Sequence, residues 1–212
     1  MKTIFFKKAT EVLSSEILRV ATGINEFYFQ PGTVVNFKGR VTLAGGIHFR
    51  GQCRIEDGVS IDTGCVLNNV SIGKGSNIRS HSILNNSTIG KNNVIGPHCF
   101  IRDESSIGDS CIVGSHVEVA RSKLGVKTKI SHQAFVGDAI IDDRVIVGAG
   151  GVFCNFDGLD KQISEVGEDT IVGSGTMIVS PVKIGARVTI GAGSIVKKDI
   201  ENDELFVQRR SR

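Results

Sequence analysis

The chain has 212 residues, long enough for one domain with a sizeable core, and contains 26 glycines but only three prolines and no tryptophan. Glycine this frequent without a three-residue period excludes collagen and suits a fold with many corners. The net charge of +3 comes from interspersed acidic and basic residues, which argues against a nucleic-acid partner. No segment reaches the roughly 18 apolar residues that span a bilayer. The apolar part of the N-terminal segment is short and is followed directly by lysines. We therefore expect neither a membrane partner nor a signal peptide.

The first 30 residues lack the period that governs the rest of the chain. Their apolar positions are spaced mostly by three and four, at Phe6, Ala9, Val12, Leu13, Ile17 and Val20. This spacing predicts a helix over about 7–21. Because solenoids need capped ends, we expect residues 1–30 to form a helical cap or linker at one end of the fold.

From about residue 33 to residue 198, large apolar residues recur every six positions, with a few steps of five. They are Phe37, Leu43, Phe49, Ile55, Ile61, Leu67, Ile72, Ile78, Leu84, Ile89, Ile95, Ile101, Ile107, Val113, Val119, Leu124, Ile130, Val136, Ile141, Val147, Phe153, Val172, Ile178, Ile184, Ile190 and Val196. A period of six fits neither a helix nor one amphipathic strand. It indicates short strands meeting at corners, three per turn of a solenoid. The sequence therefore predicts an all-β, left-handed parallel β-helix over residues 31–200.

The residues between these apolar positions predict how each corner is built. Small residues such as Ser76 and Ala134 follow four positions after an aliphatic residue and are expected inside, where the interior narrows. Glycine often follows the aliphatic residue directly, as at Gly73 and Gly90. We expect Gly or Asn to take the corner itself, where a positive φ is often needed.

Cysteine usage indicates a reducing compartment. The five cysteines are Cys53, Cys65, Cys99, Cys111 and Cys154, an odd number without any Cys-x-x-Cys pair. We interpret them as reduced and structural, because a buried free thiol behaves as a small hydrophobe. Reduced thiols are typical of the cytoplasm, which is the expected location.

The apolar ladder breaks once, between Phe153 and Val172. Segment 154–170 contains the turn signal Asp157-Gly158 among mixed polar residues, so we expect it to leave the β-helix as a loop. Loops on rigid scaffolds often carry function. Residues 201–212 form a short tail with apolar residues and three arginines, which we expect to pack on a neighbour or to fray.

A prism-shaped rod has no concave pocket of its own, whereas ligand sites need concavity. Rods that assemble in a closed ring create clefts between them, so we expect a homotrimer with its site between subunits. His98 and His116 lie one turn apart and should stack. No two histidines have the five-residue separation of metal-binding members of this fold class. Outward-facing surface histidines are therefore favoured, and no metal is expected.

Longer motifs stand out from residue 96 onward. They are Gly96-Pro97 with Arg102, Val117-Glu118, Ser131-His132, Val136-Gly137-Asp138-Ala139, Gly148-Ala149-Gly150, Cys154-Asn155-Phe156-Asp157-Gly158, Val172-Gly173-Ser174 and Pro181-Val182. In these motifs the chain resembles the C-terminal acetyltransferase domain of the bifunctional glucosamine-1-phosphate acetyltransferase / N-acetylglucosamine-1-phosphate uridyltransferase. The resemblance is strongest over residues 130–200, and the helix at 7–21 is similar to the linker that joins that family's two domains.

The resemblance implies an acetyltransferase with acetyl-CoA as co-substrate. His132 falls on the family's catalytic base, and Glu118 could orient or charge-balance its imidazole. An imidazole with a pKa near ~6.5 can take the proton that an attacking amine loses. Backbone N–H groups at the corners could stabilise the oxyanion.

Other site residues are also implied by the resemblance. Arg102 and Lys161 match cations that bind the sugar phosphate, and Asn155 matches a residue beside the acceptor sugar. The acetyl-CoA contacts correspond to Ala149, Ser174 and Arg209.

Three acceptor-side positions depart from the family pattern. Phe135 stands where the family has a tyrosine, and Ala120, with Arg121 next to it, stands where the family has a lysine. Ile146 replaces an asparagine that binds substrate in the family. Lost polar contacts discriminate strongly against the original substrate. The identity of the donor is therefore easier to infer than that of the acceptor. We expect the acceptor to be an amino sugar phosphate or a nucleotide-linked sugar, with glucosamine 1-phosphate as the nearest candidate.

Two alternatives stay open. One is an O- or N-acetyltransferase of cell-surface polysaccharide precursors. The other is a non-catalytic β-helix that binds a sugar nucleotide or a partner protein, against which the retained His132 and Asn155 argue.

Overall fold

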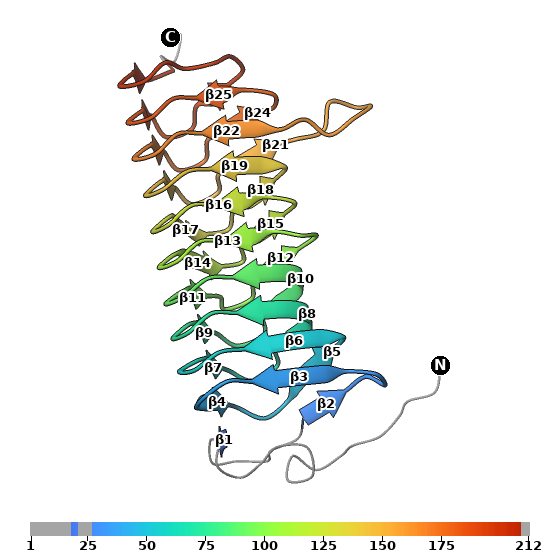
Figure 1. Cartoon of the computed structure of the whole chain (residues 1–212). Helices are drawn as coiled ribbons and strands as arrows, with labels where there is room; N and C mark the ends of the chain where they lie inside the picture. The colour runs from blue at the N-terminus through green and yellow to red at the C-terminus, as the bar shows by residue number, and fades with distance from the viewer. Residues whose placement is uncertain (1–17, 21–26, 209–212) are drawn as a thin grey trace.

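The computed structural model describes residues 18–20 and 27–208, and this part of the chain consists of short strands without a helix. The strands pair in parallel from coil to coil and build an elongated, three-sided β-helix (Figure 1). The expected all-β parallel β-helix is thereby confirmed. No helix in the described ranges could cross a membrane.

Each coil contributes one strand to each of three faces, here called A, B and C in chain order. Face A is an 11-stranded sheet. Its strands are β1 (Leu18–Val20), β4 (Val41–Leu43), β7 (Ser60–Ile61), β9 (Asn77–Ile78), β11 (Val94–Ile95), β14 (Ile112–Ser115), β17 (Lys129–His132), β20 (Ile146–Val147), β23 (Ile171–Val172), β26 (Thr189–Ile190) and β28 (Leu205–Phe206).

Faces B and C share two long strands, β8 (Val66–Ile72) and β10 (Ile83–Ile89), which run around the corner between these faces. The other strands of face B are β2 (Phe27–Phe29), β5 (Ile47–Arg50), β12 (Phe100–Arg102), β15 (Glu118–Ala120), β18 (Phe135–Gly137), β21 (Val152–Cys154), β24 (Met177–Val179) and β27 (Ile195–Val196). Those of face C are β3 (Val34–Phe37), β6 (Gln52–Ile55), β13 (Ser106–Ile107), β16 (Lys123–Leu124), β19 (Ala139–Ile141), β22 (Ser164–Val166) and β25 (Lys183–Ile184).

The six-residue ladder forms the core. Along face A, Ile61 pairs in register with Ile78, and Ile78 with Ile95, so identical aliphatic side chains stack through the interior. All three are essentially inaccessible to solvent. Burial of each such side chain stabilises the fold by about 1.5–3 kcal/mol. The small residues Ser76 and Ala134 are also buried, as expected.

The glycines of the repeat have two separate roles. Gly73, which directly follows an aliphatic residue, has no positive φ, but a Cβ there would lie 2.7 Å from the carbonyl carbon of Gly90 in the next coil. The positive φ falls two residues later, at Gly75 (φ 71°) and at Asn92 (φ 55°). The first glycine therefore permits close stacking, and the second position makes the corner.

The expected helix over 7–21 falls mostly outside the described residues. Its described part, Leu18–Val20, is instead strand β1, paired in parallel with Val41–Leu43 of β4. The helix prediction is wrong for these three residues. The open edge of face A offers unpaired backbone groups, and pairing with them outweighs the local apolar spacing.

The interruption is shorter than the sequence predicted. The chain leaves face B after Cys154 and rejoins face C at β22, where Val166 is buried and pairs with Ile141. The ladder thus resumes at Val166, one step before Val172. Only residues 155–163 form the loop, which projects from the stack between β21 and β22 (Figure 1).

The tail continues the fold as far as it is described. Leu205 and Phe206 form β28, which pairs with Thr189 and Ile190 of β26. The Gln208 side chain accepts a hydrogen bond from the backbone N–H of Ile195 at 2.9 Å. Residues 205–208 therefore close the last coil instead of fraying. Arg209 lies outside the described residues.

All five cysteines are free, and Cys53, Cys65, Cys99 and Cys111 are buried. Burial raises the pKa of the Cys99 thiol to about 12 and the pKa of Cys65 and of Cys111 to about 11. These thiols stay protonated at neutral pH and unreactive. The interpretation of these four cysteines as structural is confirmed.

Candidate active site

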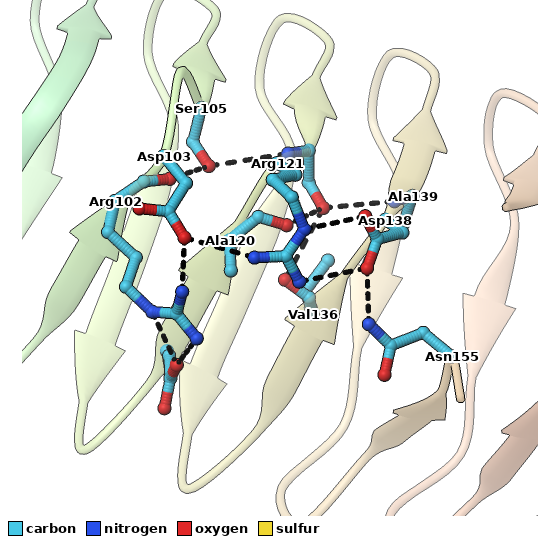
Figure 2. Close-up of polar contacts among 11 residues, drawn as sticks. Arg102, Asp103, Ser105, Ala120, Arg121, Val136, Asp138, Ala139 and Asn155 are labelled. Atoms are coloured by element: carbon cyan, nitrogen blue, oxygen red, sulfur yellow. Dashed lines mark hydrogen bonds and ion pairs between the residues drawn. The ribbon is translucent and has the colours of Figure 1, made fainter. Parts of the chain in front are cut away.

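A row of paired charges runs along the corner between faces B and C. It consists of Arg102, Asp103, Glu118, Arg121 and Asp138 and is called the charged ladder below (Figure 2). Asp103, Arg121 and Asp138 have φ of 54°, 50° and 51°. They occupy the same left-handed corner position in three successive coils, so their side chains lie one above another.

Each arginine of the ladder is shared between two carboxylates. Arg102 donates from Nε to Glu118 Oε1 at 2.9 Å and from Nη2 to the same oxygen at 2.7 Å, and it also pairs with Asp103. Arg121 holds both oxygens of Asp138, at 2.7 and 2.9 Å, and reaches Asp103 at 3.0 Å. The carboxylates thus fix both guanidinium planes by charge-assisted hydrogen bonds.

The ladder has more negative than positive charge, since two arginines face three carboxylates. Partial burial alone raises the pKa of the Asp138 carboxyl. The hydrogen bonds from Arg121 and Asn155, with the charges of Arg121 and Lys161, outweigh burial and hold that pKa below its ordinary value. Asp138 is therefore ionised at neutral pH, and both arginines are already neutralised before any ligand arrives.

The loop after β21 is tied to this ladder. Asn155 is buried and donates from Nδ2 to Asp138, and the backbone N–H of Ser164 donates to the Asp138 carbonyl at 3.2 Å. A Cβ at Gly137 would lie 2.6 Å from the Phe135 ring and 2.7 Å from Asn155 Nδ2. Gly137 therefore leaves the space that brings Phe135 and Asn155 together.

Lys161 lies on the exposed return of the same loop, where it forms an antiparallel bridge with Phe156. Asp157 organises the tip, since its carboxylate accepts from the backbone N–H groups of Leu159 and Asp160, each at 2.8 Å. Within the described residues, Lys161 makes no ion pair, in contrast to Arg102 and Arg121. It is the cation of this region that remains available to an anionic ligand.

His132 ends β17 on the corner between faces A and B, and its side chain is exposed. Its carbonyl accepts from Gly150 N–H at 3.2 Å. In the same way the Ala149 carbonyl accepts from Gly175 N–H, and the Ser174 carbonyl from Gly193 N–H, both at 2.8 Å. His132, Ala149 and Ser174 therefore occupy equivalent positions on three consecutive coils.

The other sequence-predicted residues are distributed as follows. Glu118 pairs with Arg102 and, within the described ranges, makes no hydrogen bond or ion pair with His132. Ala120 is fully buried. Ile146 is exposed on face A in register with Lys129 and Ile171.

Three histidines stack on the corner between faces A and B. The ring centroids of His98 and His116 are 5.2 Å apart, as expected, and His81 continues the stack at 5.3 Å. Sequence reasoning missed His81 because its coil is one residue shorter. No group of three His, Cys, Asp or Glu side chains in the described part of the chain is arranged to hold a metal ion.

Comparison with known proteins agrees with the coil architecture. The family described as bacterial transferase hexapeptide (six repeats) matches residues 86–121 and 164–198. Over these two stretches the chain is similar to that family.

The amino-acid sequence is also similar to those of known bifunctional proteins named GlmU. It is 41% identical over 169 residues to the bifunctional protein GlmU of Chromobacterium violaceum, a match that covers 80% of this chain and 37% of that protein. GlmU of Herminiimonas arsenicoxydans is 37% identical over 169 residues, which again cover 80% of this chain and 37% of that protein. The chain therefore spans little more than a third of these relatives. The resemblance inferred from the motifs is confirmed.

Among solved structures, a mutant of perosamine N-acetyltransferase from Caulobacter crescentus, in complex with CoA and GDP-perosamine, is 24% identical with a TM-score of 0.49. The match covers 55% of this chain and 53% of that one.

Proposed function

We propose that this protein is an acetyl-CoA-dependent acetyltransferase whose acceptor is an amino sugar. The observation that carries the proposal is the alignment of His132, Ala149 and Ser174 at one corner on consecutive coils. This alignment supports His132 as the base and Ala149 and Ser174 as contacts of acetyl-CoA. The similarity to GlmU over 80% of the chain supports the same assignment.

In the proposed reaction the acceptor amine attacks the carbonyl carbon of the acetyl thioester. The imidazole of His132 takes the proton that the amine loses. The C–S bond then breaks, and the leaving thiolate of coenzyme A takes up a proton. The exposure of His132 makes its ring accessible to both substrates.

The charged ladder limits where a phosphate group of the acceptor could bind. A phosphate at Arg102 would compete with Asp103 and Glu118, which already neutralise that guanidinium. Lys161 is therefore the stronger candidate to bind an acceptor phosphate. Asn155, which is held by Asp138, is the candidate to bind a sugar hydroxyl or amide. Phe135 lies beside Asn155 and offers an apolar surface to the sugar ring.

An acceptor without phosphate, such as a polysaccharide precursor, is the second candidate. The surplus of carboxylates in the ladder favours it. Comparing glucosamine 1-phosphate with glucosamine at one acetyl-CoA concentration separates the two. A preference for the phosphorylated sugar that Lys161→Ala abolishes supports the first candidate, and equal turnover of both sugars supports the second.

The proposed assembly is a cytoplasmic homotrimer with its sites between subunits. Phe156, Leu159 and Ile163 on the projecting loop are 61%, 88% and 57% exposed. Exposed apolar groups gathered on one projection are typical of interaction surfaces. In a trimer this loop would reach a neighbouring subunit and complete a cleft that a single rod lacks.

Calorimetric titration with acetyl-CoA tests the donor assignment. We expect saturable binding that is lost in Ala149→Glu, because the added carboxylate would lie at the proposed coenzyme contact and repel its phosphates. No binding to the wild-type protein would favour the non-catalytic alternative.

A further inference from the structure

A groove of about 520 Å³ lies over the corner between faces B and C in the N-terminal coils, away from His132. Most of its lining residues carry a side-chain amide or hydroxyl. We call it the amide groove and define it by Asn36, Gln52, Asn69, Asn86, Ser87 and Thr88. These residues come from β3, β6, β8 and β10, so the groove crosses several coils along the axis of the rod.

The amide groove is almost free of charge. Arg54 lines it but is paired with Glu56 at 2.9 Å. Glu104 stands at its far end, where the charged ladder begins. A phosphate or a nucleic-acid backbone would find no unpaired cation among these lining residues. Cys53 and Val70 are the apolar residues of the lining, and both are buried.

Two of the amides, those of Asn69 and Asn86, are fixed before any ligand arrives. Asn69 Oδ1 accepts from the backbone N–H of Gln52 at 2.9 Å, and Asn69 Nδ2 donates to Asn86 Oδ1 at 3.1 Å. A Cβ at Gly51 would lie 2.0 Å from Asn69 Oδ1, so the glycine makes room for this amide. Side chains held in one geometry lose little entropy when a ligand binds.

The protein leaves one polar group of the groove lining unsatisfied. Ser87 is 5% exposed, and its hydroxyl has no hydrogen-bond partner among the described residues. A buried hydroxyl without a partner destabilises the fold. The Ser87 side chain faces the interior at a buried position of β10, so this hydroxyl adds no contact for a ligand in the groove.

From these features we propose that the amide groove binds an uncharged glycan chain. Several amides and hydroxyls in an elongated, neutral groove match the alternating donors and acceptors of linked sugars. The groove lies away from His132, which is on the corner between faces A and B, and it approaches the charged ladder only at its far end, at Glu104. A glycan could bind in the amide groove without any acetyl transfer taking place.

The test is calorimetric titration of the whole protein with neutral hexasaccharides, namely maltohexaose, cellohexaose and hexa-N-acetylchitohexaose, without acetyl-CoA. At least one should bind with a Kd below about 1 mM. Asn86→Gly removes the amide while suiting the left-handed φ of 44°. It should weaken binding about three- to ten-fold, the effect of one or two hydrogen bonds.

Asn85→Ala is the matched control, because Asn85 is the adjacent residue, pairs with Asn68 at 2.7 Å and does not line the groove. This variant should bind as the wild type does. The proposal is overturned if none of the neutral glycans binds, if the two variants lose binding equally, or if an oligogalacturonate binds as tightly as the neutral chains.

Discussion

His132 is the residue on which the proposed chemistry depends. If it is the general base, His132→Ala should lower the acetyl-transfer rate by roughly 10²- to 10⁴-fold, with the Kd for acetyl-CoA little changed. The stacked His98 and His116 provide the controls, and their alanine variants should keep the wild-type rate. An unchanged rate in His132→Ala, or an equal loss of coenzyme binding, would assign His132 a structural role.

The depressed pKa of Asp138 predicts a pH dependence of stability. A carboxyl whose pKa is lower in the folded state than in the unfolded state stabilises the fold at pH values above the unfolded pKa of about 3.9. That contribution is lost as the pH falls through the folded value. Asp138→Asn should therefore cost about 1–3 kcal/mol at pH 7. The difference from the wild type should shrink below about pH 4.

Urea unfolding of both proteins at several pH values measures this difference. A gap between them that stays constant down to about pH 2–3, where carboxyl groups are protonated, would show that the Asp138 charge does not stabilise the ladder.

At the scale of elements, Gly137 determines how the loop after β21 meets the β-helix. Gly137→Ala would place a methyl group 2.6 Å from the Phe135 ring and 2.7 Å from Asn155. Overpacking of this kind costs about 1–3 kcal/mol. Thermal unfolding should give a lower Tm for Gly137→Ala than for Gly191→Ala, because the Cβ added at Gly191 meets nothing closer than 3.5 Å. Equal Tm values would mean that the loop adjusts without cost.

The strands were largely predictable because a period of six has few structural solutions. The elements that escaped prediction depend on pairing between coils. Val166 was missed because it follows a loop whose length the ladder does not encode. Leu18–Val20 forms a strand because the edge of face A accepts it.

The candidate site was predictable only where a motif marked it. His132, Ala149 and Ser174 stand in recognisable motifs, and the β-helix aligns them. The charged ladder is different, because Asp103 and Asp138 become partners of Arg121 only through coil register. Charges that recur at steps of 17 and 18 residues were its only sequence signal.

At the scale of the whole molecule, the proposed active site needs more than one rod. We expect light scattering to give three times the chain mass of 22.7 kDa. Apolar loop residues such as Leu159, 88% exposed, would then be covered. Leu159→Asp should shift the protein toward monomers. A stable monomer that transfers acetyl groups at the full rate would contradict a site between subunits.

The most direct test of the proposed function is thiol release from acetyl-CoA in the presence of a panel of amino sugars, their phosphates and nucleotide-linked amino sugars. We predict that at least one acceptor gives stoichiometric release of coenzyme A and an acetylated product, and that His132→Ala abolishes most of this release. Binding of acetyl-CoA without release for any acceptor, or release that does not depend on His132, would contradict the proposed function.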